Sequence, residues 1–443
     1  MKVRIEEIRL QNYRAFESAR LRLGDLTFLV GRNGAGKSSL LDAVEFMREA
    51  LSDSLPNALD RREGLVNLHR RVTEPNAAPM GLSVILTAEL GGPTTSVSGS
   101  ASGPKRGSVS GSASGPRSGS VAGSNSGSGR GSVTASDLRP GSAGATAARP
   151  IRLLYGFRVG GLGLQVEEVL RVEGKETLGF ERRDGKFVTG VPGIDPAVPA
   201  GRLILPLIAG EQLWALTLDA LKAMRGYELV SERIAESQKI LDVLALDRDG
   251  SNAANVLEQI RQSRPEDETF IRDTLEAVLP GLLRIGTSVR DGRRRIVVEQ
   301  TLDRGVEGFW GGAVSSGTWR ALGVLLALRQ RPMPSLLLID EIEESLHPMA
   351  LSALVEAAEV CADEFPVVLT THSPEVLSEH QVTPERTRIV QWDNGHSSLY
   401  PLSEGTAASL GSLTSIGDLL RVNGLWSASE PDQVVGDILA FDA

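Results

Sequence analysis

The stretch "GRNGAGKS", residues 31–38, decides the fold. It matches the pattern G-x-x-x-x-G-K-[S/T], follows the apolar run "DLTFLV" (25–30) and precedes the helix-like "SLLDAVEFMREAL" (39–51). Glycines in such a loop let backbone N–H groups turn inward around phosphate oxygens, at the N-terminus of the helix. The sequence therefore predicts a strand, a phosphate-binding loop and a helix, which together are the start of a P-loop α/β fold.

The residues of this loop have separate expected roles. Lys37 would reach the β- and γ-phosphates of a nucleotide, and Ser38 would coordinate Mg²⁺. The alternative is a Gly-rich turn that precedes Lys-Ser by chance, and the strand and helix on either side count against it. The residues expected to bind the nucleotide are Gly31, Arg32, Asn33, Gly34, Ala35, Gly36, Lys37, Ser38 and Ser39.

A second polar site follows another apolar strand. "SLLLIDEIEESLHP" (335–348) places Asp340 and Glu341 at the C-terminal tip of a buried strand, where ligands bind in α/β sheets. Asp340 would hold Mg²⁺ directly or through water, and Glu341 would polarise the water that attacks the γ-phosphate. An acidic strand end leading into a solvated helix is the alternative, and the phosphate-binding loop upstream favours the catalytic interpretation.

A third apolar strand, in "FPVVLTTHSPEVL" (365–377), ends in polar residues with His372 at its tip. A histidine there can hydrogen-bond the γ-phosphate or the attacking water. A lone histidine is more often structural, but the order of phosphate loop, acidic strand and His-tipped strand favours a catalytic sensor.

Together these motifs resemble the ABC-type ATPases of the SMC/RecF branch, specifically the compact AAA-type ATPases related to the OLD family. Further similar stretches are "IEEIRLQNYRAFESARLRL" (5–23), "LDRDGSNAANVLEQI" (246–260) and "LGSLTSIGDLLRVNGL" (410–425). The resemblance implies an α/β P-loop NTPase of ABC/SMC type, with a mixed sheet, an antiparallel β subdomain and a helical insertion. It also implies that the protein is an ATPase, with ATP and Mg²⁺ as its cofactors.

The resemblance assigns trans-acting elements as well. Ser315 and Gly317, in "AVSSGTWRAL" (313–322), would form a signature motif that contacts the nucleotide of a second subunit, and Ser345–His347 would form a D-loop. Transporter relatives carry LSGGQ, whereas here Ser316 replaces a glycine. An ordinary Ser/Gly helix start is the alternative interpretation.

Other parts of the nucleotide site are expected from the resemblance alone. Tyr13, Arg14 and Phe16 would flank the adenine, with Arg14 as a nucleotide-binding residue. No clear Q-loop is present, although "NLHRRVTEP" (67–75) lies in the right region.

The chain divides into six expected segments. These are an N-terminal ATPase lobe with Walker A (1–91), a disordered Gly/Ser-rich repeat linker (92–150), the remainder of the β subdomain (151–210), a helical insertion (211–285), a C-terminal ATPase lobe with signature, Walker B, D-loop and H-loop (286–400) and a closing segment (401–443).

The expected linker repeats with a period of twelve residues, as in "SVSGSASGPKRG" (96–107) and "SVSGSASGPRSG" (108–119). One valine per repeat among Gly and Ser cannot offset the entropy of ordering the chain. Segment 92–150 carries six Lys or Arg and one Asp, so its net charge is +5 and that of the rest is −14. A flexible linker is favoured over a tether to nucleic acid.

Two further features bear on partners. The hairpin "TSVRDGRRRIVVEQ" (287–300) gathers Arg290 and Arg293–Arg295 at a tight turn, which would either contact nucleic-acid phosphates or be a solvated tip. The single cysteine, Cys361, lies in an alanine-rich helical stretch, where a small buried residue is favoured over a reactive thiol.

These features predict a cytoplasmic switch without a membrane partner, since we find no signal peptide and no apolar run long enough to span a bilayer. Two copies would close head to tail on ATP. Family analogy suggests action in DNA maintenance or anti-phage defence, with DNA and a separate nuclease or toxin effector as partners. Fewer than a hundred residues follow His372, too few for a Toprim nuclease. The alternatives are a transporter ATPase subunit, which lacks its LSGGQ here, and a non-catalytic scaffold, which Lys37 and Glu341 disfavour.

Overall fold

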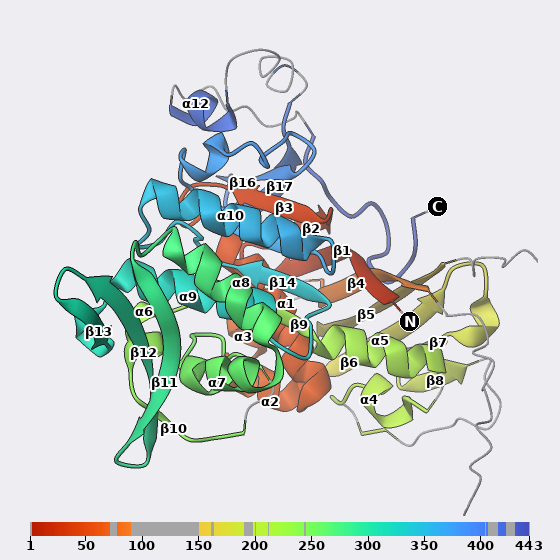
Figure 1. Ribbon diagram of the computed structural model, residues 1–443. Coiled ribbons are helices and arrows are strands. Elements are labelled where there is room, and N and C mark those ends of the chain that lie inside the picture. Colours follow the sequence, from red (N-terminus) through yellow and green to blue (C-terminus); the bar gives the residue numbers. More distant parts are fainter. Residues whose placement is uncertain are drawn as a thin grey trace, which may run out of the picture. The chain divides into compact units, whose positions relative to one another are not determined.

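Three short apolar runs form neighbouring parallel strands at the centre of the computed structural model (Figure 1). They are β3 (Leu26–Val30), β15 (Val367–Thr371) and β14 (Leu336–Ile339), in that order, and every residue in them is buried. Because parallel strands end at the same edge, the residues that follow these three strands lie close together. This edge receives the phosphate loop, Asp340 and His372.

The structure describes residues 2–70, 78–89, 150–160, 164–189, 198–199, 201–210, 212–242, 245–403, 405, 415–421 and 430–442. Within them, residues up to 89 and from 150 onward form one compact unit. The expected linker, apart from Pro150, lies outside the described residues, as do part of "NLHRRVTEP" and part of the expected closing segment.

In the described part of the chain, a mixed sheet of thirteen strands has the order β8-β7-β6-β5-β4-β1-β2-β17-β16-β3-β15-β14-β9. The strands not yet given are β1 (Lys2–Tyr13), β2 (Phe16–Arg22), β4 (Met80–Glu89), β5 (Ile151–Gly160), β6 (Gln165–Val172), β7 (Phe180–Arg183), β8 (Lys186–Thr189), β9 (Met224–Tyr227), β16 (Thr387–Asp393) and β17 (His396–Pro401). From β8 to β2 all pairings are antiparallel, which gives the expected antiparallel region beside a parallel one. The expected mixed α/β fold is confirmed.

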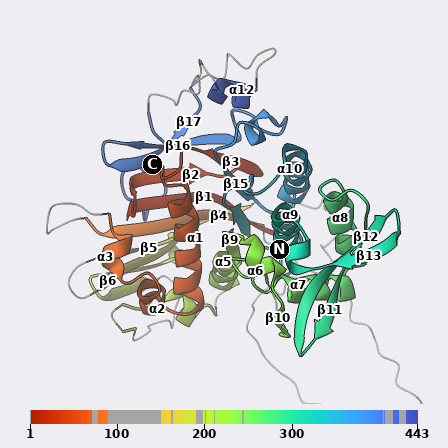
Figure 2. The ribbon, with the colours of Figure 1, turned by 90° about the vertical axis from the view of Figure 1, so that its left-hand side faces the viewer.

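The described part of the chain also contains the following helices. They are α1 (Lys37–Ser52), α2 (Leu55–Asp60), α3 (Leu65–Leu68), α4 (Leu205–Ile208), α5 (Gln212–Lys222), α6 (Ser231–Ala235), α7 (Ala253–Ser263), α8 (Pro265–Glu276), α9 (Ser316–Arg329), α10 (Pro348–Ala362) and α12 (Ile416–Arg421). Alternate residues of β14 enter opposite hydrophobic clusters: Leu336 and Leu338 join the cluster of α1, and Leu337 and Ile339 join that of α9 and α10. Figure 2 shows α1 and these two helices on opposite sides of the sheet.

The stretch expected to be a helical insertion, 211–285, contains strands as well as helices. β9 pairs with β14 and so belongs to the central sheet. The apolar spacing of "SERIAESQKILDVLAL" (231–246) is typical of a helix, but the helix there ends at Ala235, because β10 (Gln238–Lys239) pairs with a strand of a second sheet.

This second sheet is built on the expected hairpin. Its strands are β10, β11 (Leu282–Arg290), β12 (Arg293–Leu302) and β13 (Gly305–Phe309), with β12 at the centre. Ile285 and Ile296 on its inner side are buried in the same cluster as α7 and α8. None of the described helices is both long and apolar enough to span a bilayer.

Candidate functional site

The phosphate-binding loop runs from the end of β3 to the start of α1, as expected. Gly31 is required by packing, because a Cβ there would lie 2.4 Å from the carbonyl oxygen of Val390 in β16. Gly36 has a φ of 109°, and a Cβ there would lie 2.6 Å from Ser397 Oγ. Both glycines thus allow the loop to pass close to the β16–β17 hairpin.

Lys37 is directed back into this loop. Its buried ammonium group donates hydrogen bonds to the carbonyl oxygens of Gly31 (2.6 Å) and Arg32 (3.2 Å). Burial lowers the pKa of Lys37, and the nearby carboxylates of Glu341 and Asp340 counteract part of that effect. The ammonium group therefore lies between the phosphate loop and the acidic end of β14.

Asp340 joins the loop to the acidic strand. Its Oδ2 accepts a hydrogen bond from Ser38 Oγ at 2.7 Å, and its Oδ1 accepts one from Thr370 Oγ1. The hydroxyl of Thr370, in β15, also accepts a hydrogen bond from the Glu341 N–H at 2.9 Å. Thr370 is fully buried and thus fixes both acidic residues, a role that the sequence motifs did not indicate.

Glu341 has an unusual backbone conformation. Its φ is 45°, in the left-handed region that non-glycine residues rarely adopt. Such conformations persist where the surrounding structure holds them, and they are concentrated at functional sites. The side chain of Glu341 is half-buried beside Lys37.

His372 lies at the end of β15 and is paired with Glu343. Glu343 Oε1 accepts a hydrogen bond from the His372 backbone N–H at 2.7 Å and lies 2.9 Å from its Nδ1. Sequence reasoning passed over Glu343, because the pattern Asp340-Glu341 drew attention to the first acidic pair of "DEIEE".

A cavity of about 800 Å³ borders the phosphate loop. Its lining residues are Val30, Gly31, Arg32, Asn33, Gly34, Ala35, His372, Ile389, Val390, Gln391, Trp392 and Leu420. Trp392, at the end of β16, is half exposed and was not foreseen from the sequence. An exposed indole near a phosphate loop is a signal that could have been noticed, but its strand could not be placed beside β3 without the fold.

Ser315 and Gly317 lie away from that cavity. They stand at the N-terminus of α9, where Ser315 Oγ accepts a hydrogen bond from the Thr318 N–H at 3.1 Å. A Cβ on Gly317 would lie 2.6 Å from the carbonyl oxygen of Ser345, in the expected D-loop. Within one chain, the structure therefore joins the expected signature motif to the D-loop and not to the phosphate loop.

The expected adenine contacts need correction. Tyr13 and Phe16 are fully buried, so neither ring is available to a nucleotide. Tyr13 instead donates a hydrogen bond to Asp42 Oδ2 at 2.6 Å, and Arg14 pairs with the same oxygen at 2.8 Å. Arg14 lines a separate cavity of about 350 Å³ with several Arg and Glu side chains.

The arginines of the β11–β12 turn mostly contact their own chain. Arg293 donates hydrogen bonds to the Ser237 carbonyl, Arg294 donates one to Asn255 Oδ1 at 2.9 Å, and Arg295 lies 4.0 Å from the centre of the Trp310 ring. Arg290 is exposed and lies 3.7 Å from the neighbouring Asp291. Three of the four arginines thus contact other residues of the chain, so the group is neither a fully solvated tip nor a set of arginines free to bind nucleic-acid phosphates.

Cys361 is buried in α10 and is free, as expected. Burial raises the pKa of its thiol to about 11, which keeps it protonated at neutral pH.

Two family models match parts of the chain. A model described as "AAA ATPase domain" matches residues 1–73, and one described as "AAA domain, putative AbiEii toxin, Type IV TA system" matches residues 243–378. The first region contains Lys37 and Ser38, and the second contains Asp340, Glu341 and His372. No curated protein sequence matches the chain.

One solved structure of an SMC head is similar in fold, and two others are weaker matches. A crystal structure of an SMC head bound to the C-winged helix domain of ScpA has a TM-score of 0.50 and 13% identity, covering 91% of this chain and 99% of that chain. The SMC head domain from Thermotoga maritima has a TM-score of 0.41 and 11% identity, covering 90% of this chain and 99% of that chain. An SMC head domain with an extended coiled coil, bound to the C-terminal domain of ScpA derived from Pyrococcus furiosus, has a TM-score of 0.45 and 11% identity, covering 92% of this chain and 98% of that chain. Two AAA ATPase family models thus match parts of the chain, and its fold is similar to that of an SMC head.

Proposed function

We propose that the protein is an Mg²⁺-dependent switch that binds and hydrolyses ATP. The contact between Ser38 Oγ and Asp340 Oδ2 carries the proposal: these oxygens lie 2.7 Å apart, although the residues are 302 positions apart in the sequence. Hard oxygen ligands suit Mg²⁺, which is commonly bound by one or two protein groups together with water and substrate phosphates. Ser38 and Asp340 would therefore hold the ion, which would neutralise charge on the phosphates.

The other residues of this edge have roles that follow from their positions. The Lys37 ammonium group would exchange its two carbonyl contacts for phosphate oxygens. Glu341 would orient the attacking water and accept its proton, and His372, held by Glu343, would contact the γ-phosphate or this water. The presence of all these groups supports hydrolysis over a scaffold that only binds the nucleotide.

We further propose a head-to-tail dimer formed on ATP. The N-terminus of α9, with Ser315 and Gly317, is exposed or half-exposed and does not line the phosphate-loop cavity of its own chain. A helix N-terminus of this kind suits an anion supplied by a second subunit. One site would then combine the phosphate loop of one subunit with α9 of the other.

For its biological role we propose DNA maintenance or anti-phage defence, exerted on DNA or a separate effector. The description of the family model matching residues 243–378 names a toxin–antitoxin system, which supports a search for partners of that type. DNA, nuclease and toxin partners are the candidates.

The experiment is phosphate release from ATP by the full chain, with Mg²⁺ and with EDTA. We expect release only with Mg²⁺, and at least ~10-fold weaker nucleotide binding for Lys37→Ala, because the charged donor to phosphate is lost. Lys175→Ala, which removes an exposed lysine, is the matched control. Unchanged nucleotide affinity for Lys37→Ala would refute the phosphate-loop assignment, and absent phosphate release would refute hydrolysis.

A further inference from the structure

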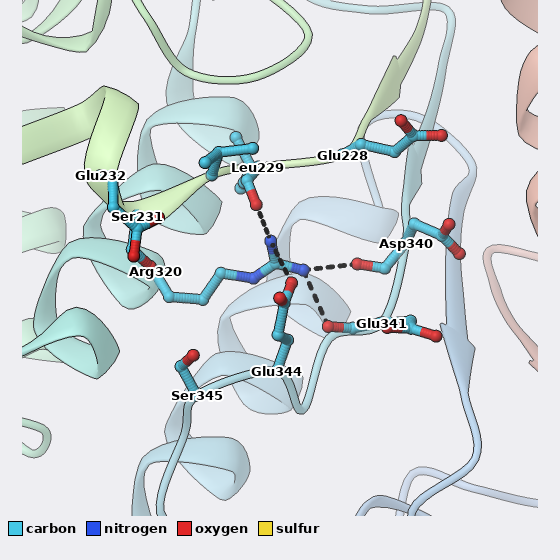
Figure 3. Close-up of a pocket in the computed structure, with 10 residues that line it drawn as sticks. Glu228, Leu229, Ser231, Glu232, Arg320, Asp340, Glu341, Glu344 and Ser345 are labelled. Atoms are coloured by element: carbon cyan, nitrogen blue, oxygen red, sulfur yellow. Dashed lines mark hydrogen bonds and ion pairs between the residues drawn. The ribbon is translucent and has the colours of Figure 1, made fainter.

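A single buried arginine connects α9 to the acidic end of β14. Arg320 is 1% exposed, and its guanidinium group donates hydrogen bonds to the carbonyl oxygens of Asp340 (2.6 Å) and Glu341 (2.8 Å), as well as to that of Leu229 (Figure 3). Its Nη1 also lies 3.1 Å from Glu344 Oε2. Every one of these partners lies outside α9.

These contacts fix the backbone that carries the two acidic side chains. The carbonyls of Asp340 and Glu341 follow each other, and both accept from the same nitrogen, so the peptide planes on either side of Glu341 are held in place. Glu341 has its left-handed φ of 45° at this point. Such a conformation is unfavourable for a non-glycine residue and needs support from its surroundings.

An apolar side chain could not replace the guanidinium group here. Without it, the carbonyls of Leu229, Asp340 and Glu341 would lose a donor at a largely buried position, which is unfavourable for each of them. A cavity of about 220 Å³, with Glu228 and Glu232 in its wall, lies against Arg320, so the group is held by polar contacts more than by tight packing (Figure 3). Burial lowers the pKa of Arg320, and Glu344 is the first of the carboxylates that oppose this effect.

The same helix begins with the expected signature motif. Gly317 packs against the Ser345 carbonyl, and Ser231 Oγ donates a hydrogen bond to the Ser316 carbonyl at 2.9 Å. Arg320 follows within one helical turn. A shift of the α9 N-terminus would therefore move the guanidinium group that holds Asp340 and Glu341.

We propose that Arg320 is a positioning residue that orients Asp340 and Glu341 of its own subunit and couples them to the N-terminus of α9. The inference rests on the proposed ATPase function. It adds that contact of α9 with a nucleotide in the partner subunit is relayed to the acidic residues of the first subunit. The two sites of a dimer are then linked through Arg320.

The first test compares Arg320→Met and Arg320→Lys with Arg329→Met, which changes another α9 arginine that pairs with Asp267 and Glu364 outside the site. We expect kcat to fall about 10–100-fold for Arg320→Met, as for other groups that orient metal ligands, while the affinity for ATP at saturating Mg²⁺ changes less than about two-fold. Arg320→Lys should recover part of kcat, because an ammonium group still donates to carbonyls. A lowered melting temperature with unchanged kcat would show that Arg320 only stabilises the fold.

The second test asks whether Arg320 acts within its own subunit. Lys37→Ala removes one subunit's phosphate-loop lysine but leaves its α9 intact, so mixing it with Ser315→Arg should restore activity at one site of the mixed dimer. Mixing Lys37→Ala with Arg320→Met should restore no activity. In this mixed dimer the only intact phosphate loop belongs to the subunit with Arg320→Met, whose own Asp340 and Glu341 are displaced. Equal recovery in both mixtures would overturn the proposal.

Failure of the inference and failure of the ATPase function give different results. If Ser315→Arg is not rescued by Lys37→Ala, the head-to-tail dimer is wrong. If the wild type releases no phosphate, the proposed hydrolysis is wrong. The role of Arg320 is then tested by titrating Mg²⁺ and measuring the binding of a fluorescent ATP analogue. Arg320→Met should then raise the half-saturating Mg²⁺ concentration about 10-fold or more, because Asp340 is displaced, and an unchanged concentration would refute the proposal.

Discussion

The Glu343 carboxylate contacts both the backbone N–H and the imidazole ring of His372. Its Oε1 takes part in both contacts, and its Oε2 is buried and accepts no hydrogen bond from the described residues. A carboxylate that accepts a hydrogen bond from an imidazole can fix the orientation of the ring. We interpret Glu343 as the partner that positions His372 at the phosphate loop.

Glu343→Gln tests this interpretation. It keeps an acceptor for the His372 N–H but removes the charge, so we expect kcat to fall about 10-fold with little change in ATP affinity. Glu359→Gln, which breaks a surface pair with Arg386, is the control and should leave kcat unchanged. An equal kcat for both variants would mean that Glu343 does not assist His372.

At this scale, the sequence predicted the residues that lie next to each other in a motif. Lys37, Ser38, Asp340 and His372 end apolar strands or begin a helix, as the motifs predict, and their role in binding a nucleotide stays a prediction. The contacts of Thr370 and Arg320 could not be predicted, since both depend on pairing between elements far apart in the chain.

Among the elements, the start of α4 depends on one buried acid. Glu168, in β6, accepts hydrogen bonds from the N–H groups of Ile204 (2.5 Å) and Leu205 (3.0 Å) and from the Tyr155 hydroxyl (2.9 Å). Arg182 is the charged group that interacts with it. Burial raises the pKa of Glu168 from 4.5 to about 7, because desolvation outweighs these contacts.

The raised pKa predicts a pH dependence of stability. The folded state holds a proton on Glu168 more tightly than the unfolded state does, so this stabilisation is complete below pH 4.5 and is lost as pH rises through about 7. From pH 5 to pH 8, the free energy of unfolding of the wild type should fall by on the order of 3 kcal/mol more than that of Glu168→Gln. Glu167→Gln, which affects a more exposed pair with Arg158, is the control in thermal unfolding at both pH values. Parallel pH profiles of wild type and Glu168→Gln would contradict the buried-acid interpretation.

The sequence predicted most elements but not all of their pairings. The expected antiparallel β subdomain and the expected hairpin (287–300) correspond to β4–β8 and to β11 and β12. β9 was missed because "MRGY" (224–227) shows no alternation and directly follows α5. Its strand conformation comes from pairing with β14, so tertiary contacts override local preference.

For the whole molecule, the segment between β4 and β5 is an insertion in one hairpin. Ala88 pairs directly with Ile151, so a short turn could join the two strands. We expect replacement of residues 90–149 by a six-residue Gly/Ser turn to leave ATP turnover within about two-fold. It should also stabilise the fold by roughly 2 kcal/mol, because a flexible loop about ten times shorter costs less entropy to close. A large loss of turnover would show that the segment contributes to the site.

If Glu341 is the base at the acidic edge of the sheet, Glu341→Gln should block hydrolysis without preventing nucleotide binding. The variant keeps Lys37, Ser38 and Asp340, so it should bind ATP and Mg²⁺, hydrolyse ATP at least ~100-fold more slowly and remain a dimer on the ATP it cannot cleave. Light scattering of the purified variant gives its mass with and without ATP. We predict the mass of a dimer when ATP and Mg²⁺ are present and the mass of a monomer when ATP is left out. A monomer at saturating ATP and Mg²⁺ would contradict the switch.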